Sequence, residues 1–361
     1  MGEPPLSTAP LDDAAALRAL DTHDLFGAAA RLHEHARIGL MAAESFVPPS
    51  GWRPQRVLIV GMGGSAIGGD VVRAALADEL TAPLEVIRGY GLPGGVDGES
   101  FVCAVSYSGN TEETLTAYRL ALSRGARTAV IATGGQLADE ARRAKAPVVT
   151  VPSGLAPRAA LGYLLFALLG VLRRVGAIAV GDGLLEESIG HQEAAERKFG
   201  ISVPAAANPA KRIAGDLLNR FPIIYGGTAA LAVAAYRWRT QLNENAKVLA
   251  SHHRLPELNH NEVVGWDLPA DQAKQTAVVL LRSATEDART RIRAQFTADL
   301  VRSRAGAFHE ALCGGGHALL QTLEGIVLGD FVSLYLAALR QVDPYPVATI
   351  DALKRTLAQP R

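Results

Sequence analysis

The feature that most constrains the fold is a strand, a glycine-rich turn and a small-residue helix in direct succession. The apolar run RVLIV (56–60) leads into GMGGSAIGGD (61–70) and then into the helical pattern VVRAALADEL (71–80). Four further apolar runs alternate with helical segments, at residues 84–90, 101–108, 127–135 and 147–154. Because each run is apolar throughout, we expect a parallel sheet that helices cover on both faces.

The same order of elements restarts in the second half of the chain. FPIIYGG (221–227) predicts a strand and a glycine turn before an alanine-rich helix, and TAVVLLRS (276–283) predicts another strand. AGAFHEAL (305–312) indicates a further strand, and residues 317–340 form a long apolar helical pattern. The chain is therefore expected to be α/β, with two doubly wound parallel sheets of flavodoxin-like type and a repeat visible in pattern only.

A chain of 361 residues exceeds the usual size of one compact core, so two domains are expected. From Leu11 to Phe46 the apolar residues recur at helical spacing and predict two helices. We divide the chain into an N-terminal helical extension, a first domain, a connector helix, a second domain and a C-terminal helix, at residues 1–50, 51–180, 181–210, 211–345 and 346–361.

Composition excludes several classes of partner. Lys+Arg and Asp+Glu both number 36, so no basic field is available for nucleic acid or an anionic membrane. The apolar stretch at residues 159–172 is too short to span a bilayer and indicates a buried helix. The two cysteines, Cys103 and Cys313, exclude a disulfide framework and favour a reducing, cytoplasmic setting. No cluster has metal-ligand spacing, so we expect neither metal nor cofactor.

Two predicted strand ends carry groups that can hold a phosphate. Gly64 and Ser65 open one helix, and Ser106, Ser108 and Thr111 gather at the start of another. Ligands of open α/β sheets bind at the carboxyl ends of strands, where helix N-termini offer unpaired N–H groups. Hydroxyls and backbone amides can therefore bind a phosphate here without a lysine or an arginine.

Other interpretations of these loops are open. Gly61, Gly63 and Ala66 fit the dinucleotide pattern G-x-G-x-x-A, but that pattern needs an acidic residue closing the second strand. Glu85 lies inside that strand and Arg88 near its end, so the match is poor. The hydroxyls of the second loop could instead cap a helix. We expect one of them to do so, and three are too many for capping alone.

The loop sequences GMGGSAIGGD and SYSGNTEET resemble the first sugar isomerase (SIS) domain of the bifunctional phosphoglucose/phosphomannose isomerase family. LNENAK, ELNHNEVVGW, PRAALGY and the closing DPYPVATIDALK extend the resemblance in the same order, over nearly the whole chain from about residue 45. The resemblance implies that the five loop residues, Gly64, Ser65, Ser106, Ser108 and Thr111, hold the phosphate of a substrate.

From the residues alone, the candidate catalytic groups are ambiguous. Glu244 could be a base or a solvated glutamate paired with Lys247, and His260 could be a proton donor or a structural loop histidine. Arg158 could reach a ligand or cap a helix, and Lys354 is an ordinary lysine of an amphipathic helix. The resemblance implies specific roles: Glu244 as base, His260 and Lys354 in ring opening, and Arg158 as the group that stabilises an enediolate.

The resemblance implies a metal-independent aldose–ketose isomerase acting on glucose 6-phosphate and mannose 6-phosphate. Tyr345 replaces an expected smaller residue, which leaves the handling of mannose phosphate open. The family's active site lies between subunits, with the histidine from the neighbour, so a homodimer is expected. The apolar helix 317–340 could serve that dimer or belong to the core. Two alternatives are a non-catalytic sugar-phosphate sensor and an aminosugar-phosphate isomerase, although no basic recognition helix and no N-terminal nucleophilic cysteine are present.

Overall fold

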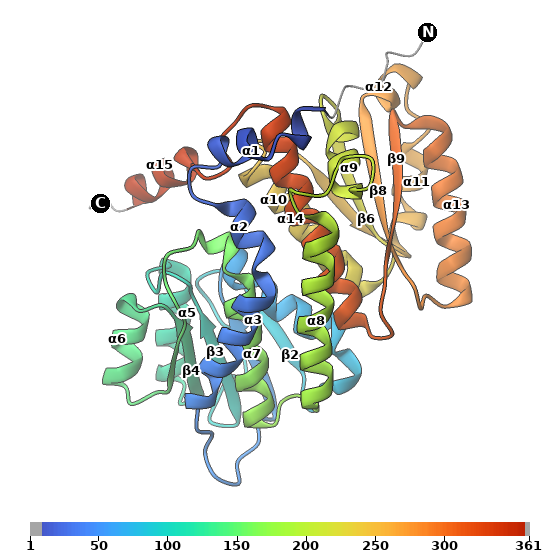
Figure 1. The fold of residues 1–361 in the computed structure, drawn as a ribbon. Coiled ribbons are helices and arrows are strands. Elements are labelled where there is room, and N and C mark those ends of the chain that lie inside the picture. The colour runs from blue at the N-terminus through green and yellow to red at the C-terminus, as the bar shows by residue number, and fades with distance from the viewer. Residues whose placement is uncertain (1–8, 358–361) are drawn as a thin grey trace.

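The computed structural model describes residues 9–357, so the outermost residues of the predicted ranges 1–50 and 346–361 lie outside it (Figure 1). The first sheet has five parallel strands in the order β2-β1-β3-β4-β5. They are β1 (Arg56–Val60), β2 (Leu84–Ile87), β3 (Ser100–Val105), β4 (Arg127–Ala132) and β5 (Val148–Thr150). Their order places β1 and β3 at the centre, so the loops after these strands lie side by side.

The second sheet has four parallel strands in the order β7-β6-β8-β9. They are β6 (Phe221–Gly226), β7 (Ser251–Arg254), β8 (Thr276–Ser283) and β9 (Ala307–Cys313). The sequence predicted β6, β8 and β9 but not β7, whose residues SHHR contain no apolar side chain. The fold class, two parallel α/β sheets with a helical N-terminal region, is confirmed.

Helices cover both faces of each sheet. On the outer faces lie α5 (Glu112–Ser123) and α6 (Gly135–Arg143) of the first sheet and α13 (Ala288–Arg304) of the second. The inner faces are covered by α4 (Ile67–Ala75) and α7 (Leu161–Val175) of the first half and by α9 (Pro209–Leu217), α10 (Ala229–Glu244) and α14 (Ala318–Leu339) of the second. Shorter helices follow β7 and close the chain: α11 (Glu262–Gly265), α12 (Ala270–Lys274) and α15 (Ala348–Leu357).

One hydrophobic core joins the inner faces of the two sheets, and α14 runs through it. Among residues 9–357, α14 is the one helix long and apolar enough to span a bilayer, and 94% of its apolar window is buried. Helices that are apolar on all sides belong in the core of a large protein when they are enclosed in this way. The structure therefore assigns the long apolar pattern to the core. The five-part division of the chain stays a prediction.

The N-terminal region forms three α-helices where the sequence predicted two: α1 (Ala14–Leu20), α2 (Leu25–Ala30) and α3 (Leu32–Ala42). The additional break falls at Asp24, which adopts a left-handed conformation and caps α2 through its side chain. Helix α3 packs tightly on α7, since a Cβ on Gly162 would lie 2.6 Å from the carbonyl oxygen of Leu32. The connector α8 (Asp182–Phe199) packs against α3 and α14, so this region is part of the core.

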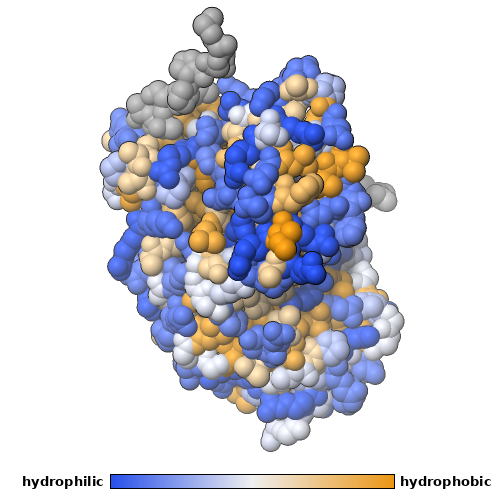
Figure 2. All heavy atoms as spheres, turned by 90° about the vertical axis from the view of Figure 1, so that its right-hand side faces the viewer, coloured by the Kyte–Doolittle hydropathy of each residue, from blue (hydrophilic) through white to orange (hydrophobic). Residues whose placement is uncertain are grey.

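The outer side of the second sheet carries exposed apolar side chains among many hydrophilic ones (Figure 2). Val264 of α11 is 70% exposed, and Ile292 and Phe296 of α13 are 62% and 61% exposed. Large side chains grouped in this way on a mostly hydrophilic face are typical of an interaction surface.

Candidate functional site

The two glycine- and serine-rich loops of the first sheet touch each other. Ser65 ends the short turn Gly63–Ser65 between β1 and α4, and its side chain is buried. The Ser65 hydroxyl oxygen accepts a hydrogen bond from the main-chain N–H of Tyr107, at 3.1 Å. The structure therefore brings the two predicted phosphate loops together.

The second loop holds its hydroxyls in one cluster. Ser106 Oγ lies 3.0 Å from Thr111 Oγ1 and accepts a hydrogen bond from the Gly109 N–H at 3.2 Å. Ser108 is exposed and accepts from the Asn110 N–H at 3.2 Å. The prediction that one hydroxyl caps the helix is wrong, because Thr111 is the N-cap of α5 and makes no side-chain capping bond. The N–H groups that open α5 consequently have no side-chain acceptor, and the positive end of the helix is free for an anion.

Glycines fix the shape of this second loop. Gly109 has φ +68°, and a Cβ there would collide with the carbonyl oxygen of Gly134, which follows β4. The Asn110 side chain accepts a hydrogen bond from the Gln136 N–H at 3.0 Å, and Leu137 N–H donates to the Gly109 carbonyl at 2.9 Å. The loop is therefore held from both sides before any ligand arrives.

Arg158 is the buried cation beside these loops, with 5% of its surface exposed. Its Nε donates to Asn245 Oδ1 at 2.6 Å, and its Nη2 donates to the carbonyls of Pro344 and Tyr345, at 2.8 Å each. Its Nη1 lies 3.6 Å from Glu244 Oε2. Burial lowers the pKa of Arg158 from its usual value, and the charge of Glu244 opposes that shift. Three fixed acceptors orient the guanidinium and leave one nitrogen facing Glu244.

Glu244 is the last residue of α10, and it meets the first-sheet loops through Arg158. A Cβ on Gly64 would lie 2.9 Å from the Pro157 carbonyl oxygen and 3.2 Å from Arg158 Cα, so the glycine permits this close approach. The Lys247 ammonium donates to the main-chain carbonyl of Glu244, not to its carboxylate. The Glu244 carboxylate is therefore paired with Arg158 and not with Lys247, which was the alternative that the sequence left open.

A buried hydrogen-bond network, which the sequence did not predict, holds the main chain of Arg158. Arg237 donates two bonds to the Asp330 carboxylate, at 2.9 and 2.7 Å, and one to the Arg158 carbonyl at 2.9 Å. Gln241 donates to Asp330 at 3.0 Å. A lone aspartate inside the apolar pattern of α14 was the available signal, because a buried carboxylate needs a partner.

The N-terminal helices also reach the site. The His23 ring stacks on the Tyr345 ring, with centroids 3.4 Å apart, and the Thr22 hydroxyl donates to Asp343 Oδ2 at 2.7 Å. Since the Tyr345 carbonyl binds Arg158, this segment fixes one wall of the site. Its contribution could not be read from the sequence, because the contact joins segments from opposite ends of the chain.

His260 lies away from this cluster within the chain. It ends the short turn Glu257–His260 after β7 and is exposed, and its side chain makes no hydrogen bond or ion pair with any described residue. Leu255 N–H donates to the Gly226 carbonyl, which places the end of β7 beside the start of α10. Glu244 is at the other end of α10, whose 16 residues span about 24 Å. One chain therefore does not bring His260 and Glu244 together.

Lys354 also lies away from the cluster. It is 70% exposed on α15, a helix with no buried residue, and its nearest ion-pair partner is Asp351 at 3.7 Å. Figure 1 shows α15 extending from the body of the molecule near the C-terminus. The structure thus gathers Ser65, Ser106, Ser108, Thr111, Gly64, Arg158 and Glu244 and leaves His260 and Lys354 apart.

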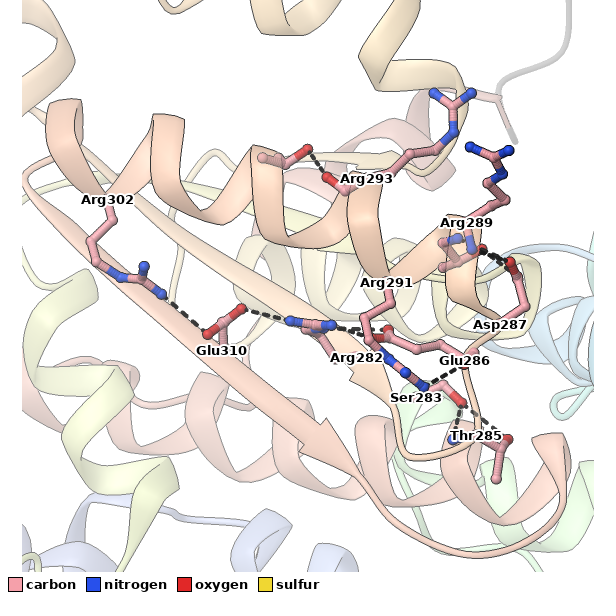
Figure 3. Close-up of polar contacts among 12 residues, drawn as sticks. Arg282, Ser283, Thr285, Glu286, Asp287, Arg289, Arg291, Arg293, Arg302 and Glu310 are labelled. Carbon is pink, nitrogen blue, oxygen red and sulfur yellow. Dashed lines mark hydrogen bonds and ion pairs between the residues drawn. The ribbon is translucent and has the colours of Figure 1, made fainter.

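In the corresponding loops of the second sheet, side chains cap the helices and pair with one another (Figure 3). The Thr228 hydroxyl caps α10 by accepting from Leu231 N–H at 3.2 Å, and the Asp287 carboxylate caps α13. Glu286 binds the Arg282 guanidinium at the end of β8, and Ser283 Oγ donates to Gln321 at 2.7 Å. These side chains satisfy the helix ends that the first sheet leaves free.

The dinucleotide interpretation also lacks its acidic residue in the structure. Glu85 pairs at the surface with Arg56, at 3.6 Å, and Arg88 beyond β2 pairs with Asp70. Within residues 9–357, no group of three or more His, Cys, Asp or Glu side chains is arranged to hold a metal ion.

Known proteins resemble this chain over most of its length. A family profile for the bacterial phospho-glucose isomerase C-terminal SIS domain matches residues 206–357. A bifunctional phosphoglucose/phosphomannose isomerase of Caldicellulosiruptor bescii is 41% identical over 84% of this chain and 90% of its own length. One of Aquifex aeolicus is 32% identical over 83% and 90%. A crystal structure of a hypothetical protein from Thermus thermophilus has a TM-score of 0.75 at 17% identity, covering 97% of this chain and 95% of that one. The chain belongs to the bifunctional phosphoglucose/phosphomannose isomerase family.

Proposed function

We propose that this protein interconverts glucose 6-phosphate and mannose 6-phosphate with fructose 6-phosphate through a cis-enediolate. The observation that carries the proposal is the Arg158–Glu244 pair, at 3.6 Å, beside two hydroxyl-bearing loops that leave helix N-termini free. A base, a fixed cation and an anion-binding end of a helix are the groups that this reaction needs. Relatives named for both activities support the choice of substrates.

In the proposed reaction, the phosphate binds at Ser65, Ser106 and Thr111 and fixes the sugar chain over Arg158. Glu244 removes the proton from C2, and the electron pair forms the C1–C2 double bond as negative charge develops on O1. The free nitrogen of Arg158 stabilises that charge without reorganising, because its other donors are already bound. Glu244 then returns the proton to C1 while the O2 proton passes to O1, which gives the ketose. For the mannose ester, rotation about C2–C3 presents the opposite C2 face to the same carboxylate.

We propose that the protein acts as a homodimer in which His260 opens the sugar ring in the partner's site. Within one chain His260 is at the far end of α10 from Glu244, so a second copy is the available source. The surface around His260 supports this arrangement. Asn259 donates to Thr297 of α13 at 2.9 Å, and the exposed Ile292 and Phe296 lie within one and a half turns of Thr297 on that helix.

Lys354 is proposed to assist ring opening. Ile350, Leu353 and Leu357 form an exposed apolar stripe along α15, at 41%, 58% and 51% exposure. A stripe at helical spacing with no cover in its own chain is typical of a helix that docks elsewhere. Docking of α15 would bring Lys354 from solvent toward a site.

A reducing, cytoplasmic location is part of the proposal. Both cysteines are free and buried, and burial raises the pKa of Cys103 to about 12, which keeps its thiol protonated and unreactive. Such cysteines need no oxidising compartment.

Exchange in deuterated water tests the proposed reaction. Purified protein is incubated with glucose 6-phosphate or mannose 6-phosphate in D2O with a chelator, and products are followed by proton NMR. We expect fructose 6-phosphate and deuterium at C2 of the recovered aldose, with no effect of the chelator. A sugar-phosphate sensor would bind both esters without exchange, and an aminosugar-phosphate isomerase would act on glucosamine 6-phosphate instead. Absence of both product and exchange would falsify the isomerase function.

A further inference from the structure

A large cleft lies between the two halves of the molecule, apart from the site described above. Its volume is about 670 Å³, within the range of small-molecule pockets. It is formed by α4, the start of α10, the residue Arg88 beyond β2 and the strand β7 with Arg254. Arg88 directly follows β2 and Arg254 ends β7, so the cleft lies at the carboxyl ends of these two edge strands, where α/β sheets bind ligands. None of the predicted site residues lines it.

The cleft carries unmatched positive charge. Three guanidinium groups, those of Arg73, Arg88 and Arg254, line it together with one carboxylate, that of Asp70. Asp70 is nearly buried and pairs with both Arg88 and Arg73, the latter at 3.4 Å. Arg254 makes no ion pair with any residue between 9 and 357. The cleft therefore has an excess of two positive charges that no protein carboxylate lining it balances.

The cleft also offers an imidazole and a flat wall. His253 Nδ1 accepts a hydrogen bond from the Arg254 N–H at 2.9 Å, and His253 Nε2 makes no hydrogen bond with any residue between 9 and 357. The Tyr236 ring forms one wall beside the small side chains of Ala232 and Val233. Arg88 lies over that ring at 5.6 Å from its centroid, so the aromatic face and the cation are adjacent.

We propose that this cleft binds a phosphorylated small molecule, with its phosphate between Arg73, Arg88 and Arg254 and its uncharged body against Tyr236. A phosphate monoester carries nearly two negative charges at neutral pH, which matches the excess of two positive charges. Guanidinium groups bind phosphate oxygens in pairs and with fixed geometry. The site is independent of the substrate phosphate loops, whose Ser65, Ser106 and Thr111 lie outside the cleft.

Calorimetric titration with phenyl phosphate tests this site in Ser106→Ala protein, in which the substrate loop is weakened. Phenyl phosphate provides the dianion and a flat body but has no sugar for the isomerase site. We expect one binding event per chain, weakened at least tenfold when Arg254→Gln is added, because this exposed arginine has no structural partner to lose. Arg73→Gln serves as a second variant, and Arg289→Gln, an exposed arginine at the start of α13 with no ion pair among the described residues, is the matched control.

Each titration result either supports the proposed cleft site or overturns it. Binding that survives Ser106→Ala, falls with Arg254→Gln and Arg73→Gln and is unchanged by Arg289→Gln supports the site. No binding in the Ser106→Ala protein overturns it, as does equal weakening by Arg254→Gln and Arg289→Gln. Since the titration monitors no isomerisation, its failure leaves the proposed reaction unaffected.

Discussion

The two sheets end in loops of the same kind, but only the first sheet leaves its loops open. In the first half, α4 and α5 begin without any side-chain cap, although three hydroxyls lie at the start of α5. In the second half, Thr228 caps α10 and Asp287 caps α13. Helix N-termini attract anions only while their N–H groups lack other acceptors.

The two halves also differ in the charged groups at their strand ends. The first-half loops use hydroxyls, and their one cation, Arg158, is held by neutral acceptors and faces Glu244. In the second half, the loop between β8 and α13 corresponds to the loop between β3 and α5. There the Glu286 carboxylate binds the Arg282 guanidinium (Figure 3). One fold therefore yields uncapped or braced strand ends, according to whether the chain's own carboxylates occupy them.

The largest expected effect comes from the one carboxylate that belongs to the open site. Glu244→Gln should lower the isomerisation rate by about 1,000-fold, because the amide cannot accept the C2 proton. Steady-state assays and deuterium exchange measure the loss, while calorimetry should still detect substrate binding. The matched variant Glu286→Gln should keep activity within about threefold of the parent, because its carboxylate binds Arg282 at the end of β8 and belongs to the half without the proposed substrate loops. Equal losses of activity in the two variants would show that the strand-end loops of the two sheets do not differ in function.

Removal of one hydroxyl from each half should distinguish a group that binds substrate from a group that only stabilises the fold. Ser106→Ala should raise the KM for glucose 6-phosphate about 10- to 100-fold, since a hydrogen bond to a charged phosphate is lost. Ser283→Ala should leave KM unchanged and lower the free energy of unfolding by about 1 kcal/mol, because Ser283 bonds only to protein groups. Initial-rate kinetics and urea unfolding of both variants provide the measurements. A raised KM in Ser283→Ala would show that the second half also binds substrate.

Acid should weaken the second half of the molecule at Glu324 of α14, whose carboxylate bonds to His191 and Lys198 of α8 and to the Gly314 N–H after β9. Burial alone would raise the pKa of Glu324, but its bonds from His191, the Gly314 N–H and Lys198 outweigh burial and lower that pKa to about 2. Since the unfolded carboxyl titrates near 4.5, this stabilisation is complete above that pH and is lost as the pH falls toward 2. The gap in unfolding free energy between the parent and Glu324→Gln should narrow by about 2 kcal/mol from pH 7 to pH 3. A gap that is constant across this range contradicts the assignment.

The smallest effect concerns the caps. Asp287→Ala should cost about 1 kcal/mol of stability with unchanged KM, because its carboxylate only satisfies the start of α13. Thr111→Ala should cost less stability and raise KM, because Thr111 makes no capping bond. Thermal unfolding and kinetics on the two variants form a matched pair, and the reverse ranking would count against the open-loop interpretation.

Much of the fold could be predicted from the sequence, because buried parallel strands are continuous apolar runs. The strands at 56–60 and 276–283 are found at the predicted residues. Helix α4 begins at Ile67, earlier than predicted, because Gly68 and Gly69 belong to the helix and not to the turn. A Cβ on Gly69 would lie 3.0 Å from Ile59, so this glycine permits close packing of the helix on the sheet, while Gly68 faces Leu165 of α7. The edge strand β7 has no apolar pattern and could not be predicted.

The site was predictable only where its residues lie at strand ends. The hydroxyl loops follow from the strand–turn–helix pattern, whereas the ion pair of Arg158 with Glu244 joins two segments far apart in the sequence. The bracing contacts of Asp330 and Tyr345 depend on packing between distant segments, which no local pattern records. His260 and Lys354 are far from the cluster in the single chain, and their roles stay predictions.

A crystal structure of the Glu244→Gln protein with glucose 6-phosphate would show where the substrate phosphate binds. We expect it at the start of α5, bound by Ser65, Ser106 and Thr111, with C1 and C2 of the sugar between Arg158 and residue 244. A phosphate bound instead at the second-half loops, beside Thr228 and Ser283, would contradict this expectation.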